Sequence, residues 1–180
     1  DPYLPFREVL STLCADVEER WTAGRVTRSQ ALRLWGLLPD AVEALVTHGP
    51  HLIGAFVPGG ELLERAAAHG SVDRALMDRV RGLSMERGDA GRGDSVDQAH
   101  IFQEVADVVR ALAADRPLLL MLDDLHWADA SSTGLLFHLG RHVADSRILI
   151  LGAYRPEEVS LGRQGGEYSL ESVLDEFKRR

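Results

Sequence analysis

Two acidic residues, Asp123 and Asp124, stand side by side directly after the apolar run from Leu118 to Leu122. A run of this length, bounded by a proline and by acids, is typical of a strand that is buried on both faces. Mg²⁺ takes oxygen ligands, and a second carboxylate orients or deprotonates an attacking water, so the pair suits a magnesium–nucleotide site. Without further context, acids that merely cap the strand end and the next helix explain the pair equally well.

A second apolar run, from Ile148 to Leu151, ends at Gly152 and is followed by Tyr154 and Arg155. Helical spacing from Ala130 to Ala144 separates the two runs. Strand, helix and strand in this order form a βαβ unit with parallel strands and a right-handed crossover. Ligands of open parallel sheets bind at the carboxyl ends of the strands, where both runs carry polar side chains. The sequence therefore predicts an α/β fold.

The remaining sequence predicts helices that lead up to this unit. Apolar residues recur every three or four positions, and Ser95 with Gln98 forms a capping box before the clearest helix. Residues 84–95 are predicted to be a mobile loop, because they are rich in glycine and charge. This loop divides the chain into a helical segment, 1–95, and a segment with the two strands, 96–180. The predicted helices cover residues 6–21, 27–35, 41–46, 61–69, 72–83 and 96–114.

Composition excludes several classes of protein. The 180 residues are 45% apolar and 27% charged, which is typical of a soluble globular chain, and the net charge of −8 argues against direct contact with nucleic acid. The longest apolar run is far shorter than a membrane span, which needs about 20 residues. Cys14 is the only cysteine, so no internal disulfide forms, and we expect a cytoplasmic location. The chain begins with neither Met nor a basic leader, and we expect it to be a segment of a longer protein.

The stretch from Pro117 to Asp129 (PLLLMLDDLHWAD), followed by a helix and by Leu149 to Glu158 (LILGAYRPEE), resembles a known family. It is similar to the ATPase domain of STAND-type P-loop ATPases, which are relatives of the AAA+ proteins. These domains occur in bacterial regulators of the LuxR type or fused to cyclases and kinases. The resemblance is strong over residues 96–158 and weaker over 20–90, and the HWAD letters are its most specific part. It implies a partial P-loop NTPase core with a Walker B strand, preceded by a mostly helical segment.

Residue roles follow from the resemblance by position. Asp123 corresponds to the Walker B acid that holds Mg²⁺ through water, and Asp124 to the residue that polarises the attacking water. Arg155 corresponds to a sensor residue that contacts the terminal phosphate of ATP. Many relatives have Glu at the second acidic position. Because Asp is shorter by one methylene, slow hydrolysis is expected, which suits a switch whose output passes through attached effector domains or self-association.

One feature of the family does not occur in the sequence. A P-loop needs Gly-x-x-x-x-Gly-Lys-Ser/Thr, in which backbone amides cradle the phosphates and the Lys neutralises them. Nineteen of the 20 basic residues are Arg, and the only Lys is Lys178. The resemblance implies a P-loop before Asp1, so we expect ATP and Mg²⁺ to bind productively only together with that segment. Two other interpretations remain open: a regulatory interaction module with a decayed ATPase core, and a metal-dependent phosphohydrolase built on the paired acids.

Several weaker motifs favour structural interpretations. His126 next to Asp129 and the paired acids invites a transition-metal site, but neighbours on a turning segment do not converge on one ion. We therefore expect Trp127 to pack under the end of the sheet and Asp129 to cap the next helix. The Arg-Gly-Asp tripeptide at residues 92–94 is frequent by chance in a chain rich in these residues. Trp21 and Trp35 are predicted to be core residues, Glu157 and Glu158 solvated charges, and His138 and His142 surface residues of one helix.

Overall fold

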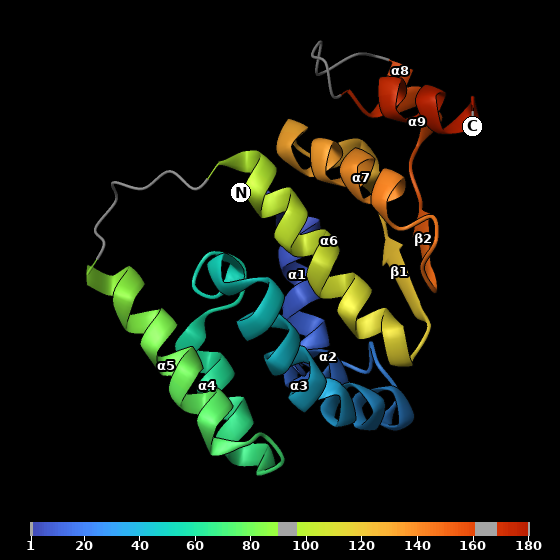
Figure 1. The fold of residues 1–180 in the computed structure, drawn as a ribbon. Helices are drawn as coiled ribbons and strands as arrows, with labels where there is room; N and C mark the ends of the chain where they lie inside the picture. The colour runs from blue at the N-terminus through green and yellow to red at the C-terminus, as the bar shows by residue number, and fades with distance from the viewer. Residues whose placement is uncertain (1, 90–96, 161–168, 180) are drawn as a thin grey trace. The chain divides into compact units, whose positions relative to one another are not determined.

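The computed structural model describes residues 2–89, 97–160 and 169–179 (Figure 1). The chain folds as two compact units, which we describe separately. Arg7–Leu112 forms the helical unit, and Asp1–Phe6 together with Ala113–Arg180 forms the sheet unit. No helix in the described ranges is both long and apolar enough to cross a membrane.

The helical unit is built from amphipathic helices whose apolar faces supply its core. Leu38 and Leu45 of one long helix, Leu52 and Ile53 after it, and Leu62 of the next are all almost completely buried. Figure 1 shows α4 and α5 side by side, and both contact α3. The elements that include residues of this unit are α1 (Leu4–Leu13), α2 (Glu18–Thr22), α3 (Arg28–His48), the 3₁₀ turn η1 (Pro50–Leu52), α4 (Gly59–His69), α5 (Arg74–Asp89) and α6 (Gln98–Asp115).

The two helices predicted around Pro39 are one helix, α3, with the proline inside it. Thr27 begins α3 with a capping box: its side chain accepts from the Gln30 amide, and the Gln30 side chain accepts from the Thr27 amide. Proline removes one helical hydrogen bond and crowds the preceding turn. The buried face nevertheless continues from Leu38 to Ala41 and beyond. We conclude that the burial of this face offsets the lost bond, which local propensity does not reveal.

Two further boundaries differ from the predictions. The helix predicted over 6–21 is interrupted after Leu13, because Ala15 adopts a left-handed conformation with φ 61°. Val17 continues the apolar spacing and is fully buried although it lies between helices, so burial alone imitates helical periodicity there. The predicted loop 84–95 is wrong for residues 84–89, which extend α5. The rest of that loop, with the Arg-Gly-Asp tripeptide and the Ser95 cap, lies outside the described residues.

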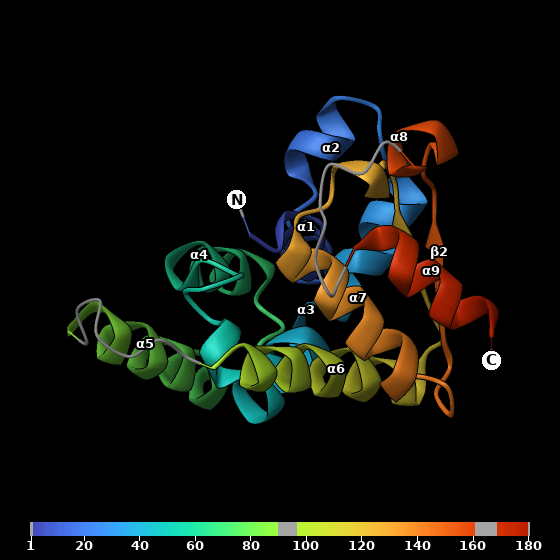
Figure 2. The same cartoon turned by 90° about the horizontal axis from the view of Figure 1, so that it is seen from above.

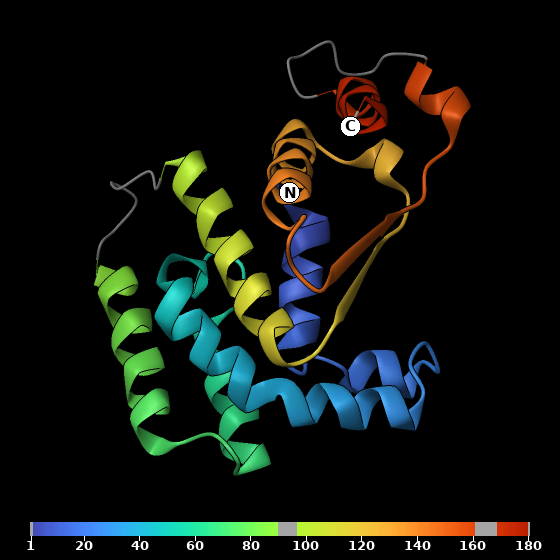
Figure 3. The same ribbon diagram turned by 45° about the vertical axis from the view of Figure 1, so that its right-hand side comes forward.

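The sheet unit contains the predicted βαβ order. Strands β1 (Leu118–Leu122) and β2 (Ile148–Gly152) pair in parallel, and α7 (Ala130–His142) connects them. Figures 2 and 3 show α7 running beside the two strands, and its residues Leu135 and Leu139 are completely buried. The other elements are the 3₁₀ turn η2 (Leu125–Trp127), α8 (Pro156–Ser160) and α9 (Leu170–Lys178). A mostly helical chain with a small parallel sheet is consistent with the predicted α/β class.

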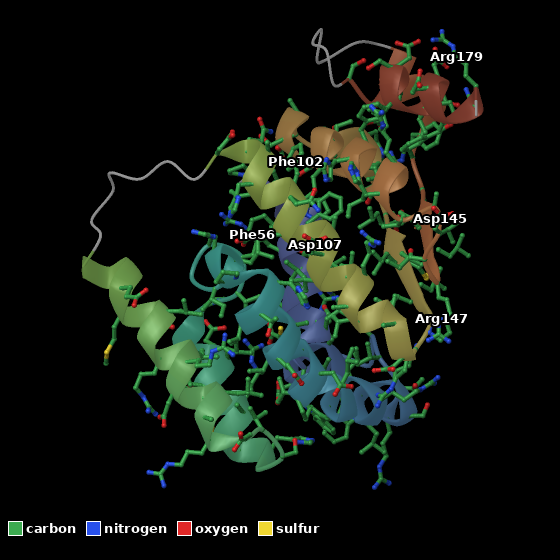
Figure 4. The ribbon with its side chains drawn as sticks, in the orientation of Figure 1. Phe56, Phe102, Asp107, Asp145, Arg147 and Arg179 are labelled. Carbon is green, nitrogen blue, oxygen red and sulfur yellow. The ribbon has the colours of Figure 1, made fainter. Side chains whose placement is uncertain are left out.

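Side-chain contacts fix both ends of this unit. Before β2, the Arg147 guanidinium donates to the carbonyls of Ala113 and Ala114 at the end of α6, where its charge also complements the helix dipole (Figure 4). On α7, Gly140 leaves room for Phe177 of α9, because a Cβ at this glycine would lie 2.4 Å from the Phe177 ring. The Phe177 ring stacks on Phe137 with a centroid distance of 6.1 Å.

The prediction that both strands are buried on both faces is wrong. Leu120 and Leu122 are buried, whereas the alternate side chains of both strands are each more than half exposed. The sequence lacks alternation because all these residues are apolar, so the period of two appears only in the burial. The described residues thus present one apolar face of the sheet to solvent, formed by Leu119, Met121, Leu149 and Leu151.

Candidate functional site

The acidic pair and Arg155 leave the sheet at the same end. The register places Leu122 opposite Gly152, so the chain after β1 and the chain after β2 start next to each other. Two more hydrogen bonds extend the ladder past the strands: the Ala153 amide donates to the Leu122 carbonyl at 2.8 Å, and the Leu125 amide donates to the Ala153 carbonyl at 2.9 Å. The two exits are therefore tied together along the segments that carry the predicted site residues.

Asp124 sits in a tight turn. Its backbone has φ 52° and ψ 37°, the left-handed region, and its amide donates to the Asp123 carboxylate at 2.9 Å. Aspartate tolerates this conformation better than most residues, because its short side chain bonds locally. Both acids are exposed. The turn thus presents two carboxylates to solvent at the sheet end, and backbone outliers of this kind cluster at functional sites.

His126 lies behind Asp124 and is the most unusual side chain of this region. Its side chain is 0% exposed, and neither ring nitrogen makes a hydrogen bond to another described residue. Nε2 lies 3.7 Å from Asp124 Oδ1 and 3.6 Å from Glu158 Oε2, distances of ion pairs rather than of hydrogen bonds. The structure therefore brings His126 to one of the paired acids and to Glu158 of α8, which the sequence predicted to be only a solvated charge.

Arg155 completes a continuous group of ionisable side chains. Its Nη1 lies 3.1 Å from Glu158 Oε1, and Glu158 is held in the first turn of α8 by its own amide, which donates to the Arg155 carbonyl. The sequence of contacts Asp124, His126, Glu158, Arg155 thus runs from the exit of β1 to the exit of β2. We call these four residues the strand-end group. Asp123 lies beside the group, and no described contact links its side chain to His126.

Asp129 is committed to structure, as predicted. Its Oδ1 accepts hydrogen bonds from the amides of Ser131 and Ser132, and its Oδ2 accepts from the Ser132 hydroxyl and the Tyr3 amide. Burial by itself would raise the pKa of this carboxyl, but the hydrogen bonds from Ser132, Tyr3 and Ser131 together lower the pKa below its usual value. Asp129 is therefore the N-cap of α7, and each of its two carboxylate oxygens accepts two hydrogen bonds.

Three other predictions about aromatic and histidine residues need correction. Trp127 does not pack under the sheet end but is largely exposed, because the 3₁₀ turn directs the His126 side chain inward instead. Trp21 is also substantially exposed, and Trp35, which it meets edge to face at 5.6 Å, is only partly buried, so neither is a core residue. His142 lies on the surface of α7 as expected, whereas Nε2 of His138 is buried.

The donor set of the strand end fits a magnesium nucleotide. The exposed carboxylates of Asp123 and Asp124 are hard oxygen ligands of the kind that Mg²⁺ prefers. The exposed guanidinium of Arg155 offers planar donors that match phosphate oxygens. The acids and the arginine follow the same end of the two strands, so a magnesium nucleotide could meet both from solvent there.

Comparison with known proteins gives one result about the family. A family model described as an AAA ATPase domain matches residues 2–151, which include the described residues of the helical unit, β1, α7 and most of β2. Arg155 and Glu158 lie beyond the matched range. No curated protein and no solved structure matches the chain.

Proposed function

The chain belongs to the AAA ATPase domain family, and on this premise we propose that it is a switch domain that binds ATP with Mg²⁺ and hydrolyses it slowly. The observation that carries the proposal is the common exit of β1 and β2, where two exposed carboxylates face solvent beside an exposed arginine. The letters LDDLHWAD further favour a STAND-type domain of a larger bacterial signalling or transcriptional regulator.

The paired acids have different roles in this proposal. Asp123 holds Mg²⁺ through water, and Asp124 polarises the water that attacks the terminal phosphate. The main chain of Asp124 is held in its turn by a hydrogen bond from its amide to the Asp123 carboxylate, and its side chain lies 3.7 Å from the buried imidazole of His126. A carboxylate of this length reaches only a closely held water, which is consistent with slow turnover.

His126 and Glu158 act as positioning residues. Glu158 touches both the imidazole of His126 and the guanidinium of Arg155, so it connects the water-polarising side of the site with the phosphate-sensing side. Loss of the terminal phosphate would change the charge that Arg155 faces. We propose that Glu158 and His126 transmit this change to Asp124 and to α8, through which the nucleotide state reaches other parts of the protein.

The phosphate cradle is proposed to come from outside residues 1–180. No Gly-x-x-x-x-Gly-Lys-Ser/Thr string occurs in the sequence, and Lys178 lies in α9, far along the chain from the paired acids. The exposed apolar face of the two strands supports this idea. Contiguous apolar surface of this kind marks a surface that is covered in the functional molecule.

The test compares the 180-residue chain with the same chain extended along its reading frame to include a P-loop. We expect Mg²⁺-dependent ATP hydrolysis from the extended protein and none over multiple turnovers from the 180-residue chain. Turnover by the shorter chain that Asp124→Ala abolishes would overturn the proposed external cradle and favour a metal-dependent phosphohydrolase. A reading frame without a P-loop would instead favour a regulatory interaction module.

A further inference from the structure

A second cluster of ionisable side chains lies within the helical unit, built around the buried Glu104 of α6. One carboxylate oxygen, Oε2, accepts a hydrogen bond from the main-chain amide of His51 at 3.0 Å. The other oxygen, Oε1, lies 2.5 Å from Nδ1 of His51 and 3.2 Å from Nε2 of His100. Three potential ligand atoms, one from each residue, all lie within 4.8 Å of one another.

The local sequence accounts for this convergence. His100 and Glu104 are four residues apart on α6, so they lie on the same face of the helix one turn apart. His51 comes from η1, which follows Gly49. A Cβ at Gly49 would lie 2.7 Å from Cγ2 of Val108 and 2.8 Å from Cδ1 of Leu52, so this position needs a glycine for η1 to lie close against α6. The close approach fixes the His51 main chain against Glu104.

The electrostatics of the cluster favour a cation. The side chain of Glu104 is only 7% exposed, and a buried carboxylate is costly unless it is paired and hydrogen-bonded. Among the described residues, its ion-pair partners are the two imidazoles and no lysine or arginine. Both histidines are partly exposed, at 42% and 54% of the side chain, so two of the three ligand-bearing side chains are reached from solvent.

We propose that His51, His100 and Glu104 bind a divalent transition-metal ion of the zinc class. Two imidazoles and one carboxylate suit zinc, and a water would take the fourth position. Bond lengths of about 2.0–2.1 Å in a tetrahedral site place ligand atoms about 3.3 Å apart. The pair of His100 and Glu104 already has this spacing, and His51 needs a shift of about 1 Å. The amide of His51 on Oε2 supplies the outer hydrogen bond that orients a metal-binding carboxylate.

The probe is Zn²⁺ itself, titrated by calorimetry into the purified 180-residue chain after treatment with a chelator. One equivalent is expected to bind to the wild-type chain. His100→Ala removes an exposed ligand and should weaken binding at least about tenfold, as should His51→Ala. Co²⁺ in place of Zn²⁺ is expected to give the visible absorption of a four-coordinate ion in the wild type and to lose it in His100→Ala.

The matched control is the double variant His138→Ala/His142→Ala, because this pair on α7 also presents two imidazoles that are close together, with ring centroids 3.9 Å apart. Zn²⁺ affinity should be unchanged in this control. Affinity that depends on His138 and His142 but not on His100 would overturn the proposal, as would the absence of binding at millimolar Zn²⁺. Thermal unfolding without metal checks that each variant folds. Neither readout uses nucleotide, so the result is independent of the proposed ATPase function.

Discussion

The two units each bring imidazole and carboxylate groups together, but with opposite burial. In the strand-end group the imidazole of His126 is 0% exposed, and the carboxylates of Asp124 and Glu158 are 60% and 34% exposed. In the cluster of the helical unit the carboxylate of Glu104 is 7% exposed, and the imidazoles of His51 and His100 are 42% and 54% exposed. The imidazole is thus the buried group at the strand end, whereas the carboxylate is the buried group in the helical unit.

Because the buried group differs, the two arrangements suit different ligands. In the proposed magnesium–nucleotide site, the buried imidazole of His126 would position exposed carboxylates for a ligand that arrives from solvent. A buried carboxylate that faces two partly exposed imidazoles, with no lysine or arginine among its described ion-pair partners, offers one oxygen and two nitrogen ligands to the cation proposed above. In the strand-end group the exposed members should therefore decide ligand binding and chemistry, whereas in the helical unit the buried Glu104 is itself one of the three proposed ligands. The buried members should affect stability according to the hydrogen bonds that they make.

The largest effect is expected for Asp124→Asn in the extended, ATP-hydrolysing protein. Asparagine keeps the size and tolerates the left-handed backbone of Asp124, but it cannot accept a proton. The hydrolysis rate should fall about 100- to 1000-fold, while ATP affinity changes little. Asp145→Asn is the control, because Asp145 is an exposed acid before β2, at the other end of the strand (Figure 4). An equal loss in both variants would contradict the assigned role.

The two buried members test the comparison directly. Without metal, Glu104→Ala should lower the free energy of unfolding by about 2 kcal/mol, because it leaves the His51 amide without its acceptor. His126→Leu should change it by less than about 1 kcal/mol, because the imidazole makes no hydrogen bond to a described residue. In the extended protein His126→Leu should lower kcat about tenfold with KM for ATP unchanged. Urea denaturation in the presence of a chelator measures the stability losses, and steady-state kinetics measure kcat and KM. Equal stability losses in Glu104→Ala and His126→Leu would contradict the expected difference between the two buried groups.

A smaller effect is expected where the turn behind the acids meets β2. A Cβ at Gly152 would lie 2.5 Å from Cδ1 of the buried Leu125, so Gly152→Ala must shift the Leu125 side chain, which anchors the turn between Asp124 and His126. Overpacking of this kind costs about 1–2 kcal/mol. Gly36→Ala, in α3, places the added Cβ more than 4 Å from every described atom beyond its chain neighbours and the nearby backbone of its own helix, and it should stabilise the protein by about 0.5–1 kcal/mol. Chemical denaturation measures the change in the free energy of unfolding for both variants. No loss of stability in Gly152→Ala would show that the Leu125 side chain moves aside without cost.

The smallest effect concerns the cap of α7. Asp129→Ala should lower the stability of the sheet unit by about 1 kcal/mol at neutral pH. Because the folded pKa of Asp129 lies below its ordinary value of 3.8, the stabilisation is fully present above pH 3.8 and is lost as the pH falls through the folded pKa. Denaturation of wild type and variant at pH 7 and below pH 3.8 checks this sign. A difference that grows on acidification would contradict it.

The sequence predicted the elements of the sheet unit more accurately than the boundaries of the helical unit. Proline, acids and glycine mark where the two strands begin and end, and Asp129 before two serines is a typical start of a helix, here α7. In the helical unit, the continuation of α3 through Pro39 and the break at Ala15 both depend on which apolar faces meet in the core. Local propensity cannot contain that information, because tertiary packing outweighs it.

Residue types alone determined that the acids and Arg155 follow consecutive parallel strands, that Asp129 caps a helix and that the sequence holds no P-loop lysine. These are local facts, encoded by spacing along the chain. Two contacts follow from the folded structure and not from local spacing: His126 turns inward to meet Asp124 and Glu158, and His51, 49 residues before His100, meets a buried glutamate. Contacts between distant segments depend on how whole faces pack, and the burial that gives each group its chemistry exists only after that packing.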